Sequence, residues 1–252
     1  SDPGRINAAV EFEVYGVRQP FEQAFWCEEL STYVLALDGK KHPCRVRASN
    51  AGHCLLAGVA SHERAWRATQ TLLGQDMFSG WGIRTVSSSE VRYNPMSYHN
   101  GSIWPHDNAL ITAGFARYGF KDHVLKVLTG LFDASLFVDL HRLPELFCGF
   151  ERRPGEGPTL YPVACAPQAW SAASAFLLLQ ASLGLSIKGA GNRITLFHPM
   201  LPEFLREVRI TNLRVGKASV DLLFQRHPQV GDVSAHVLRM DGQVVIEKIG
   251  AA

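Results

Sequence analysis

Two helical patterns alternate along the first three quarters of the chain. Residues 51–60, 107–119 and 168–184 are apolar on every face and rich in small residues, a composition typical of buried helices. Residues 61–74 and 121–136 carry apolar side chains at helical spacing on one face only, which is typical of half-exposed helices. The alternation predicts a mainly α fold of helical hairpins, with each buried helix followed by a half-exposed one.

The buried segments recur at an interval of about 60 residues, which indicates a structural repeat. Hairpins with small-residue helices inside and amphipathic helices outside are typical of an α/α toroid. The sequence has room for only about half of such a ring. We therefore predict that residues 1–190 form the C-terminal half of a toroid domain, whose missing N-terminal half is a partner.

From about Asn192 the period of the pattern changes. Five segments between residues 193 and 249 alternate apolar with polar residues or are rich in β-branched residues, and Gly and Asp turns separate them. This pattern predicts strands. We expect residues 191–252 to form a small antiparallel β appendage.

Composition excludes several functional classes. The formal net charge of +2 comes without a dense basic cluster, which argues against a nucleic-acid partner. Five widely spaced cysteines without a C-x-x-C pair indicate free thiols in a reducing, cytoplasmic compartment. No apolar run is long enough to predict a signal peptide or a membrane span.

Polar segments precede each of the three buried helices. If these helices run parallel, the segments gather at one end of the ring and form a site. One side chain is enough to cap a helix, and Asp107 alone fits that role. The surplus of hydrogen-bonding groups beside an indole suits a sugar ligand instead. The candidate binding residues are Asn50, His53, His99, Asn100, Gly101, Trp104, His106, Asp107, Gln168 and Trp170.

Two other kinds of chemistry fit the sequence less well. His53, His99, His106 and Asp107 could converge on a metal, but no H-E-x-x-H or H-x-x-x-H motif is present, so we expect neither metal nor cofactor. No G-x-S-x-G motif marks a nucleophilic serine.

Sugar hydrolysis requires a pair of carboxyl groups. Glu145 is our candidate, because its apolar and aromatic surroundings can adjust its pKa. The alternative is a structural ion pair between Glu145 and Arg142 or Arg152.

Three ordered blocks, "SYHNGSIWPHDNALI", "LPELFCGF" and "CAPQAWSAAS", carry a family resemblance. Together with "FWCEELSTYVLALDG" and "RVRASNAGHCL", they resemble the C-terminal part of the glucosidase module of glycogen-debranching amylo-α-1,6-glucosidases. That module belongs with the mannosylglycerate-hydrolase-like toroid glycosidases. The resemblance covers about Phe21 to Leu183. It implies an (α/α)6 toroid and an inverting hydrolysis that releases glucose from an α-1,6 branch.

The resemblance also implies roles for individual residues. Glu145 matches the family's general base. The matching substrate-pocket residues are His99, Asn100, Gly101, Trp104, Gln168 and Trp170.

The chain departs from the family at the general acid. The family places an aspartate after a tryptophan well before the "FW-C-E" block, and only about twenty residues precede that block here. The segment "EFEVYG" at residues 11–16 has no Trp-x-Asp, so the acid is unassigned and we expect the missing half to supply it. Three alternatives stay open: a non-catalytic carbohydrate-binding remnant, a toroid glycosidase acting on a glucosyl- or mannosylglycerate, and a fragment without independent function.

Overall fold

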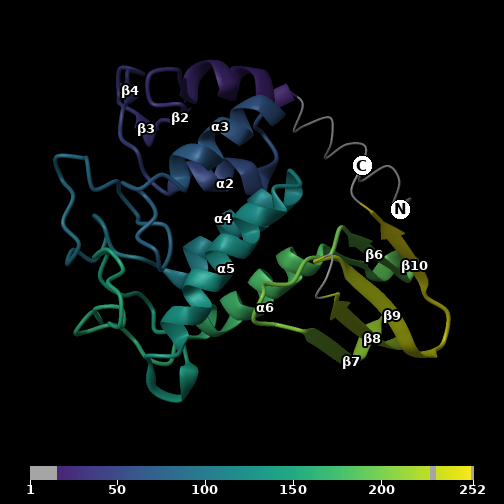
Figure 1. Cartoon of the computed structure of the whole chain (residues 1–252). Helices are drawn as coiled ribbons and strands as arrows, with labels where there is room; N and C mark the ends of the chain where they lie inside the picture. The colour runs from purple at the N-terminus through teal and green to yellow at the C-terminus, as the bar shows by residue number, and fades with distance from the viewer. Residues whose placement is uncertain (1–15, 228–230, 251–252) are drawn as a thin grey trace.

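The structure is a computed structural model that describes residues 16–227 and 231–250, so most of "EFEVYG" lies outside the described residues. Residues 16–25 are helical. The later helices are α2 (Asn50–Ala57), α3 (His62–Leu72), α4 (Pro105–Arg117), α5 (Lys121–Ser135) and α6 (Ala169–Leu183) (Figure 1). The helices form where they were predicted, with α2, α4 and α6 in the all-apolar segments and α3 and α5 in the amphipathic ones. The predicted burial does not hold for α6, in which Phe176 is 76% exposed.

The three inner helices form one row, in which α4 packs between α2 and α6. Small residues allow the close approach: a Cβ on Gly52 would lie 2.5 Å from Ile111, and a Cβ on Gly114 would lie 2.8 Å from the backbone nitrogen of Leu56. Helix α5 packs across α4 and α6, and α3 packs against α2. The core of this part includes Leu55 and Phe115, both fully buried.

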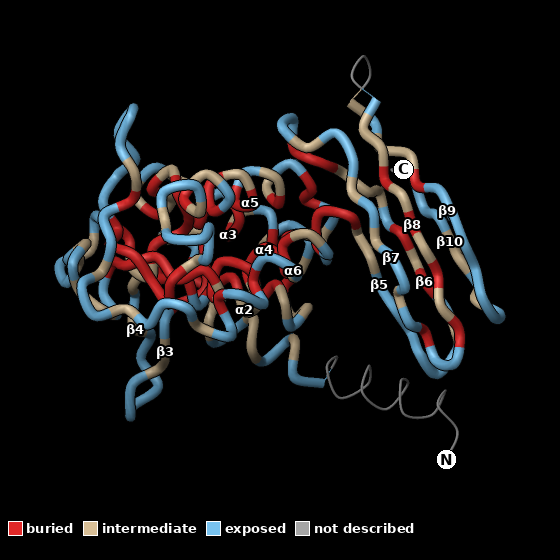
Figure 2. The backbone as a smooth tube through the Cα atoms, turned by 90° about the horizontal axis from the view of Figure 1, so that it is seen from below, coloured by how far each residue is buried: buried red, intermediate tan, exposed pale blue. Residues whose placement is uncertain are grey.

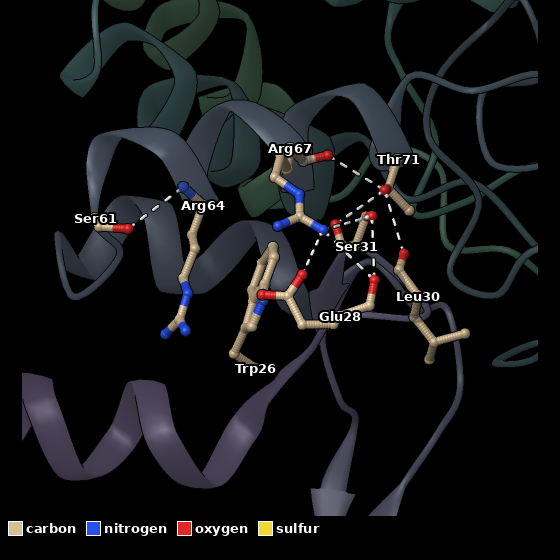
Figure 3. Close-up of polar contacts among 8 residues, drawn as sticks. All are labelled: Trp26, Glu28, Leu30, Ser31, Ser61, Arg64, Arg67 and Thr71. Atoms are coloured by element: carbon tan, nitrogen blue, oxygen red, sulfur yellow. Dashed lines mark hydrogen bonds and ion pairs between the residues drawn. The ribbon is translucent and has the colours of Figure 1, made fainter.

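Two short hairpins precede α2, and the first of them packs against α3 through β2. Strand β1 (Trp26–Cys27) pairs with β2 (Thr32–Tyr33), and β3 (Ala36–Leu37) pairs with β4 (Pro43–Cys44). Figure 3 shows how α3 holds the first hairpin.

The guanidinium groups of Arg64 and Arg67 lie 5.1 and 5.0 Å from the ring centre of Trp26. Arg67 also pairs with Glu28 at 2.7 Å, and the Thr71 hydroxyl donates to the carbonyl of Ser31. These contacts fix the chain that leads into the inner helices.

Two three-stranded sheets follow α6. One has the order β10 (Val245–Ile249), β6 (Arg193–Phe197), β5 (Leu185–Lys188), and the other has the order β7 (Glu207–Val215), β8 (Ala218–Arg226), β9 (Val233–Asp241). The β7–β8–β9 sheet is antiparallel, as predicted. The expectation of a wholly antiparallel appendage is wrong, because β10 pairs in parallel with β6. Strand β9, which precedes β10 in the chain, belongs to the other sheet. The chain therefore crosses between the sheets before β10, and β10 runs in the same direction as β6.

The two sheets bury a second core between them. Alternate residues of β8, from Ala218 to Phe224, are buried and pack with Ile194 and Leu196 of β6. Figure 2 shows buried backbone in the helical part and again along β6 and β8. Leu183 at the end of α6 belongs to this second core, so the last inner helix anchors the appendage.

Within residues 16–227 and 231–250, no helix is both long and apolar enough to cross a membrane. The division of the chain at residue 190 stays a prediction.

Candidate active site

The N-terminal ends of the three inner helices lie together. His53 of α2 contacts Asp107 of α4 through its Nε2 atom, 2.5 Å from Oδ1. His106 of α4 stacks on Trp170 of α6, with ring centres 4.1 Å apart and an interplanar angle of 8°. The segments that the sequence analysis grouped at one end of the ring therefore do meet there.

Glu145 is held by contacts from two other segments. The Tyr98 hydroxyl donates to Oε1 at 2.7 Å, and the backbone N–H of Cys165 donates to Oε2 at 3.3 Å. The Glu145 backbone N–H in turn donates to the Cys165 carbonyl at 2.9 Å. Only 7% of the residue is exposed, so these contacts replace much of its solvent.

The Tyr98 hydrogen bond is the main reason that the pKa of Glu145 lies below its usual value, against the opposing effect of burial. Glu145 is therefore ionised at neutral pH. Among the described residues no Arg or Lys forms an ion pair with it, and Arg152 pairs with Asp133 instead. The structural ion pair considered as an alternative role for Glu145 is thus not formed.

A close backbone crossing brings Tyr98 to Glu145. A Cβ on Gly149 would lie 1.7 Å from the Gly101 carbonyl oxygen, so only glycine fits there. Gly101 itself has φ +144°, a conformation that favours glycine. The Ile103–Phe147 bridge continues the contact between the two segments.

Trp104 forms part of the wall beside this pair. Its indole N–H donates to the Tyr98 carbonyl at 3.1 Å and to the Ser102 hydroxyl at 3.0 Å. Its ring centre lies 4.8 Å from that of Tyr98 and 6.3 Å from that of Trp170, both nearly edge to face. The aromatic surfaces of α4 and α6 therefore form one wall.

Asp107 lies in the first turn of α4, where its side chain pairs with His53 and makes no cap hydrogen bond. Asn108 makes the structural contacts at this helix end, since its side chain accepts from the Ile83 backbone N–H at 2.7 Å and donates to the Ile83 carbonyl at 3.0 Å. Asp107 uses Oδ1 for His53, and its Oδ2 atom is buried without a hydrogen-bond partner among the described residues. The same holds for Nδ1 of His106. Such unsatisfied buried atoms are rare in proteins.

The two histidines have opposite pKa shifts. The Asp107 carboxylate raises the pKa of His53 above its usual value. Burial lowers the pKa of His106, although Asp107 and Glu145 oppose this effect. His106 is therefore neutral near pH 7 and presents both a donor and an acceptor nitrogen.

The remaining predicted residues are exposed or half-buried. His99 is exposed and parallel to Trp104, with ring centres 6.0 Å apart. Asn50 and Asn100 are exposed. Gln168 immediately precedes α6, and its side chain helps to lower the pKa of Glu145. The roles of these residues stay predictions.

Sequence reasoning missed Tyr98 and Cys165. Tyr98 stands directly before His99 in a block already rich in candidates, so its position was the available signal. Cys165 acts through its backbone, which no residue pattern reveals.

Within the described parts of the chain, no three His, Cys, Asp or Glu side chains group as metal ligands would. An apolar cavity of about 550 Å³ lies along α5 and α6 and shares only Gln168 with the candidate residues. Its lining is unsuited to sugar hydroxyls, so we place the site by its polar chemistry.

The sequence model of the mannosylglycerate hydrolase MGH1-like glycoside hydrolase domain matches residues 4–141, more than half of the chain. The chain belongs to this family. The match includes His53 and the segment from His99 to Asp107, and it ends before Glu145. A search of curated proteins gave no match.

Solved structures share the fold of this family member. The GH63 mannosylglycerate hydrolase from Thermus thermophilus, in complex with Tris and D-glycerate, is 22% identical with a TM-score of 0.53, over 70% of this chain and 39% of that one. The same hydrolase in complex with glucose is 20% identical with a TM-score of 0.51, over 71% of this chain and 39% of that one. A chain described as a sialidase is 10% identical with a TM-score of 0.70, over 90% of this chain and 22% of that one. The chain thus spans about two fifths of the hydrolase and has a partial toroid glycosidase fold.

Proposed function

We propose that this chain forms the base-bearing half of an inverting glycoside hydrolase of the debranching type, which releases α-1,6-linked glucose from glycogen or branched dextrin. The observation that carries the proposal is the ionised Glu145 carboxylate, held by hydrogen bonds beside an aromatic wall and two unpartnered polar atoms. The debranching substrate rests on the blocks around Trp104, Glu145 and Gln168 that resemble amylo-α-1,6-glucosidases.

In this mechanism Glu145 acts as a general base. It accepts a proton from a water molecule, whose oxygen attacks the anomeric carbon on the face opposite the leaving group. The leaving oxygen takes a proton from an acid, which in inverting enzymes lies roughly 6.5–9.5 Å from the base. We assign that acid to the rest of the toroid.

The wall would hold the glucose ring. Trp170, which is 47% exposed, offers aromatic surface to the C–H face of a pyranose, and the buried Trp104 supports it from behind. Asp107 Oδ2 and His106 Nδ1 lack partners among the described residues but are buried, so they would reach sugar hydroxyls only after a side-chain movement that uncovers them.

The exposed apolar surface of helix α6 supports the proposal that the rest of a toroid packs against this chain. This helix is apolar on every face, yet Phe176 is 76% exposed and Trp170 is 47% exposed. Helices of this composition are ordinarily buried. We infer that helices from the rest of a toroid cover α6 and its neighbouring apolar cavity, and so complete the site.

Glycerate glycosides are the second candidate substrates. The family is named after mannosylglycerate hydrolase, and the structure of the Thermus thermophilus hydrolase contains D-glycerate. A glucosylglycerate would place the same glucose ring against the wall and differ only in its leaving group. A mannosylglycerate would also differ in the sugar itself, because mannose has the opposite configuration at C2. The leaving-group site would lie in the rest of the toroid.

The test compares the chain alone with the longest natural polypeptide that contains it. Each is assayed for sugar release from a branched limit dextrin, glucosylglycerate and mannosylglycerate, and NMR identifies the first anomer released. We expect inverted glucose from the dextrin with the long polypeptide and almost none with the chain alone. Release only from a glycerate glycoside would favour the second candidate. If neither preparation hydrolyses a glycoside but the chain binds glucose, the non-catalytic remnant is the better account.

A further inference from the structure

We propose that Tyr98 is the positioning residue for Glu145, and that its hydroxyl fixes the orientation in which the carboxylate meets water. This inference rests on the proposed role of Glu145 as general base. Tyr98 lies 47 residues from Glu145 along the chain and was not among the residues singled out from the sequence.

The carboxylate is held from two sides. Tyr98, which precedes α4, binds Oε1 at 2.7 Å, and the backbone of Cys165, which precedes α6, binds Oε2 at 3.3 Å. Rotation of the carboxylate would break one of these bonds. Because the Cys165 contact is the longer, the Tyr98 hydroxyl is the stronger constraint.

Tyr98 is itself immobilised. Its ring lies edge to face against Trp104, His99 and Tyr161, with ring centres 4.8, 4.6 and 5.7 Å away. Its carbonyl accepts hydrogen bonds from the indole of Trp104 and the hydroxyl of Ser102. The residue therefore joins the sugar-facing wall to the base, so the two keep a fixed relation.

The hydroxyl remains a donor over the working pH range. The hydrogen bond to Glu145 raises the pKa of Tyr98 to about 12. The other groups that influence the pKa of Glu145 are the backbone and thiol of Cys165 and the amide of Gln168, while His106 interacts electrostatically with Glu145. Loss of the Tyr98 hydroxyl leaves those groups in place, so its effect on Glu145 can be isolated.

Tyr98→Phe keeps the ring and removes the hydroxyl. The readout is the titration of the Glu145 side-chain carboxyl carbon by NMR in chain labelled with 13C-glutamate, where the signal absent from Glu145→Gln identifies the residue. We expect Glu145 to titrate at higher pH in Tyr98→Phe than in the wild type. An unchanged Glu145 titration in a folded Tyr98→Phe protein would overturn the proposal.

Tyr93→Phe is the matched control. Its hydroxyl donates to the Gly149 carbonyl at 3.0 Å in the same loop region, so the substitution removes a comparable hydrogen bond without touching Glu145. We expect no change in the Glu145 titration. An equal shift in both variants would mean that general loosening of the loops, rather than positioning, moves Glu145, and would refute the proposal.

Kinetics on a hydrolytically active polypeptide give a second readout. Tyr98→Phe should lower kcat by roughly tenfold to a hundredfold through misplacement of the base, with KM little changed. The acid limb of its pH profile should move to higher pH. The NMR titration needs no turnover, so it tests Tyr98 even if the proposed hydrolysis fails, whereas unchanged kinetics with hydrolysis intact would overturn Tyr98 alone.

Discussion

The two ends of the inner helices differ in how their polar groups are satisfied. At the C-terminal end of α6 the chain turns at Gly184, and the buried ammonium of Lys121 donates to the carbonyls of Ala181 and Ser182 at 2.8 and 3.1 Å. At the N-terminal ends, Asp107 and His106 each keep a buried atom without a partner among the described residues. The polar groups of the first end are thus satisfied within the chain, whereas the second end keeps buried polar atoms without partners there.

The comparison shows where substitutions should act. Changes at the N-terminal ends should alter sugar binding or hydrolysis while leaving stability nearly intact, and changes at the C-terminal ends should do the reverse. Four substitutions test this separation.

Glu145→Gln should have the largest effect. Without a proton acceptor, hydrolysis by an active polypeptide should fall by roughly 10²–10⁴-fold. Glucose affinity of the chain should change little, since the amide has the same shape. Glu156→Gln is the control, because Glu156 is exposed and paired with Arg153. Retention of hydrolysis in Glu145→Gln would reject this residue as the base.

Lys121→Met should cause the largest loss of stability. It leaves two carbonyls of α6 without their donor, at a cost of about 1–3 kcal/mol in the free energy of unfolding. Urea denaturation measures the change, and Lys217→Met at an exposed position is the control. The Glu145 titration should be unaffected. Equal stability of the two variants would mean that the C-terminal end is not held by Lys121.

Trp170→Ala should weaken glucose binding by roughly tenfold, because the wall loses one of its aromatic surfaces. Isothermal titration of the chain with glucose measures the affinity. Trp66→Ala is matched in exposure, at 44% against 47%, but lies on the outer helix α3. If both variants bind glucose as the wild type does, the wall is not the sugar site.

The His53–Asp107 pair should give the smallest effect, a pH-dependent one. The folded pKa of His53 is raised, so the stabilisation is fully present below its unfolded pKa of about 6.5 and is lost as pH rises through the folded value. Solvent screens the pair, whose His53 side chain is 41% exposed, so we expect less than about 1 kcal/mol.

His53→Gln removes the titrating group. The difference in unfolding free energy between wild type and His53→Gln should therefore be largest at acid pH and shrink towards pH 8. A difference that stays constant with pH would contradict the pairing.

The helical part of the fold could be predicted well from local patterns. The all-apolar segments became α2, α4 and α6, although α6 remains exposed along one side in this structure. The parallel pairing of β10 with β6 could not be predicted, since alternation identifies a strand and not its neighbour. For the same reason the strands of the appendage were found, but its mixed sheet was not.

For the site, the sequence by itself indicated which segments come together. Polar and aromatic residues before apolar helices mark helix ends, and parallel inner helices bring those ends together. Only the tertiary structure decided which atoms meet: Tyr98 with Glu145, the Cys165 backbone with the same carboxylate, and His53 with Asp107. These contacts join positions 47, 20 and 54 residues apart, and depend on the crossing at Gly101 and Gly149 and on helix packing. A residue pattern records local periodicity, whereas such contacts arise from the packing of distant segments.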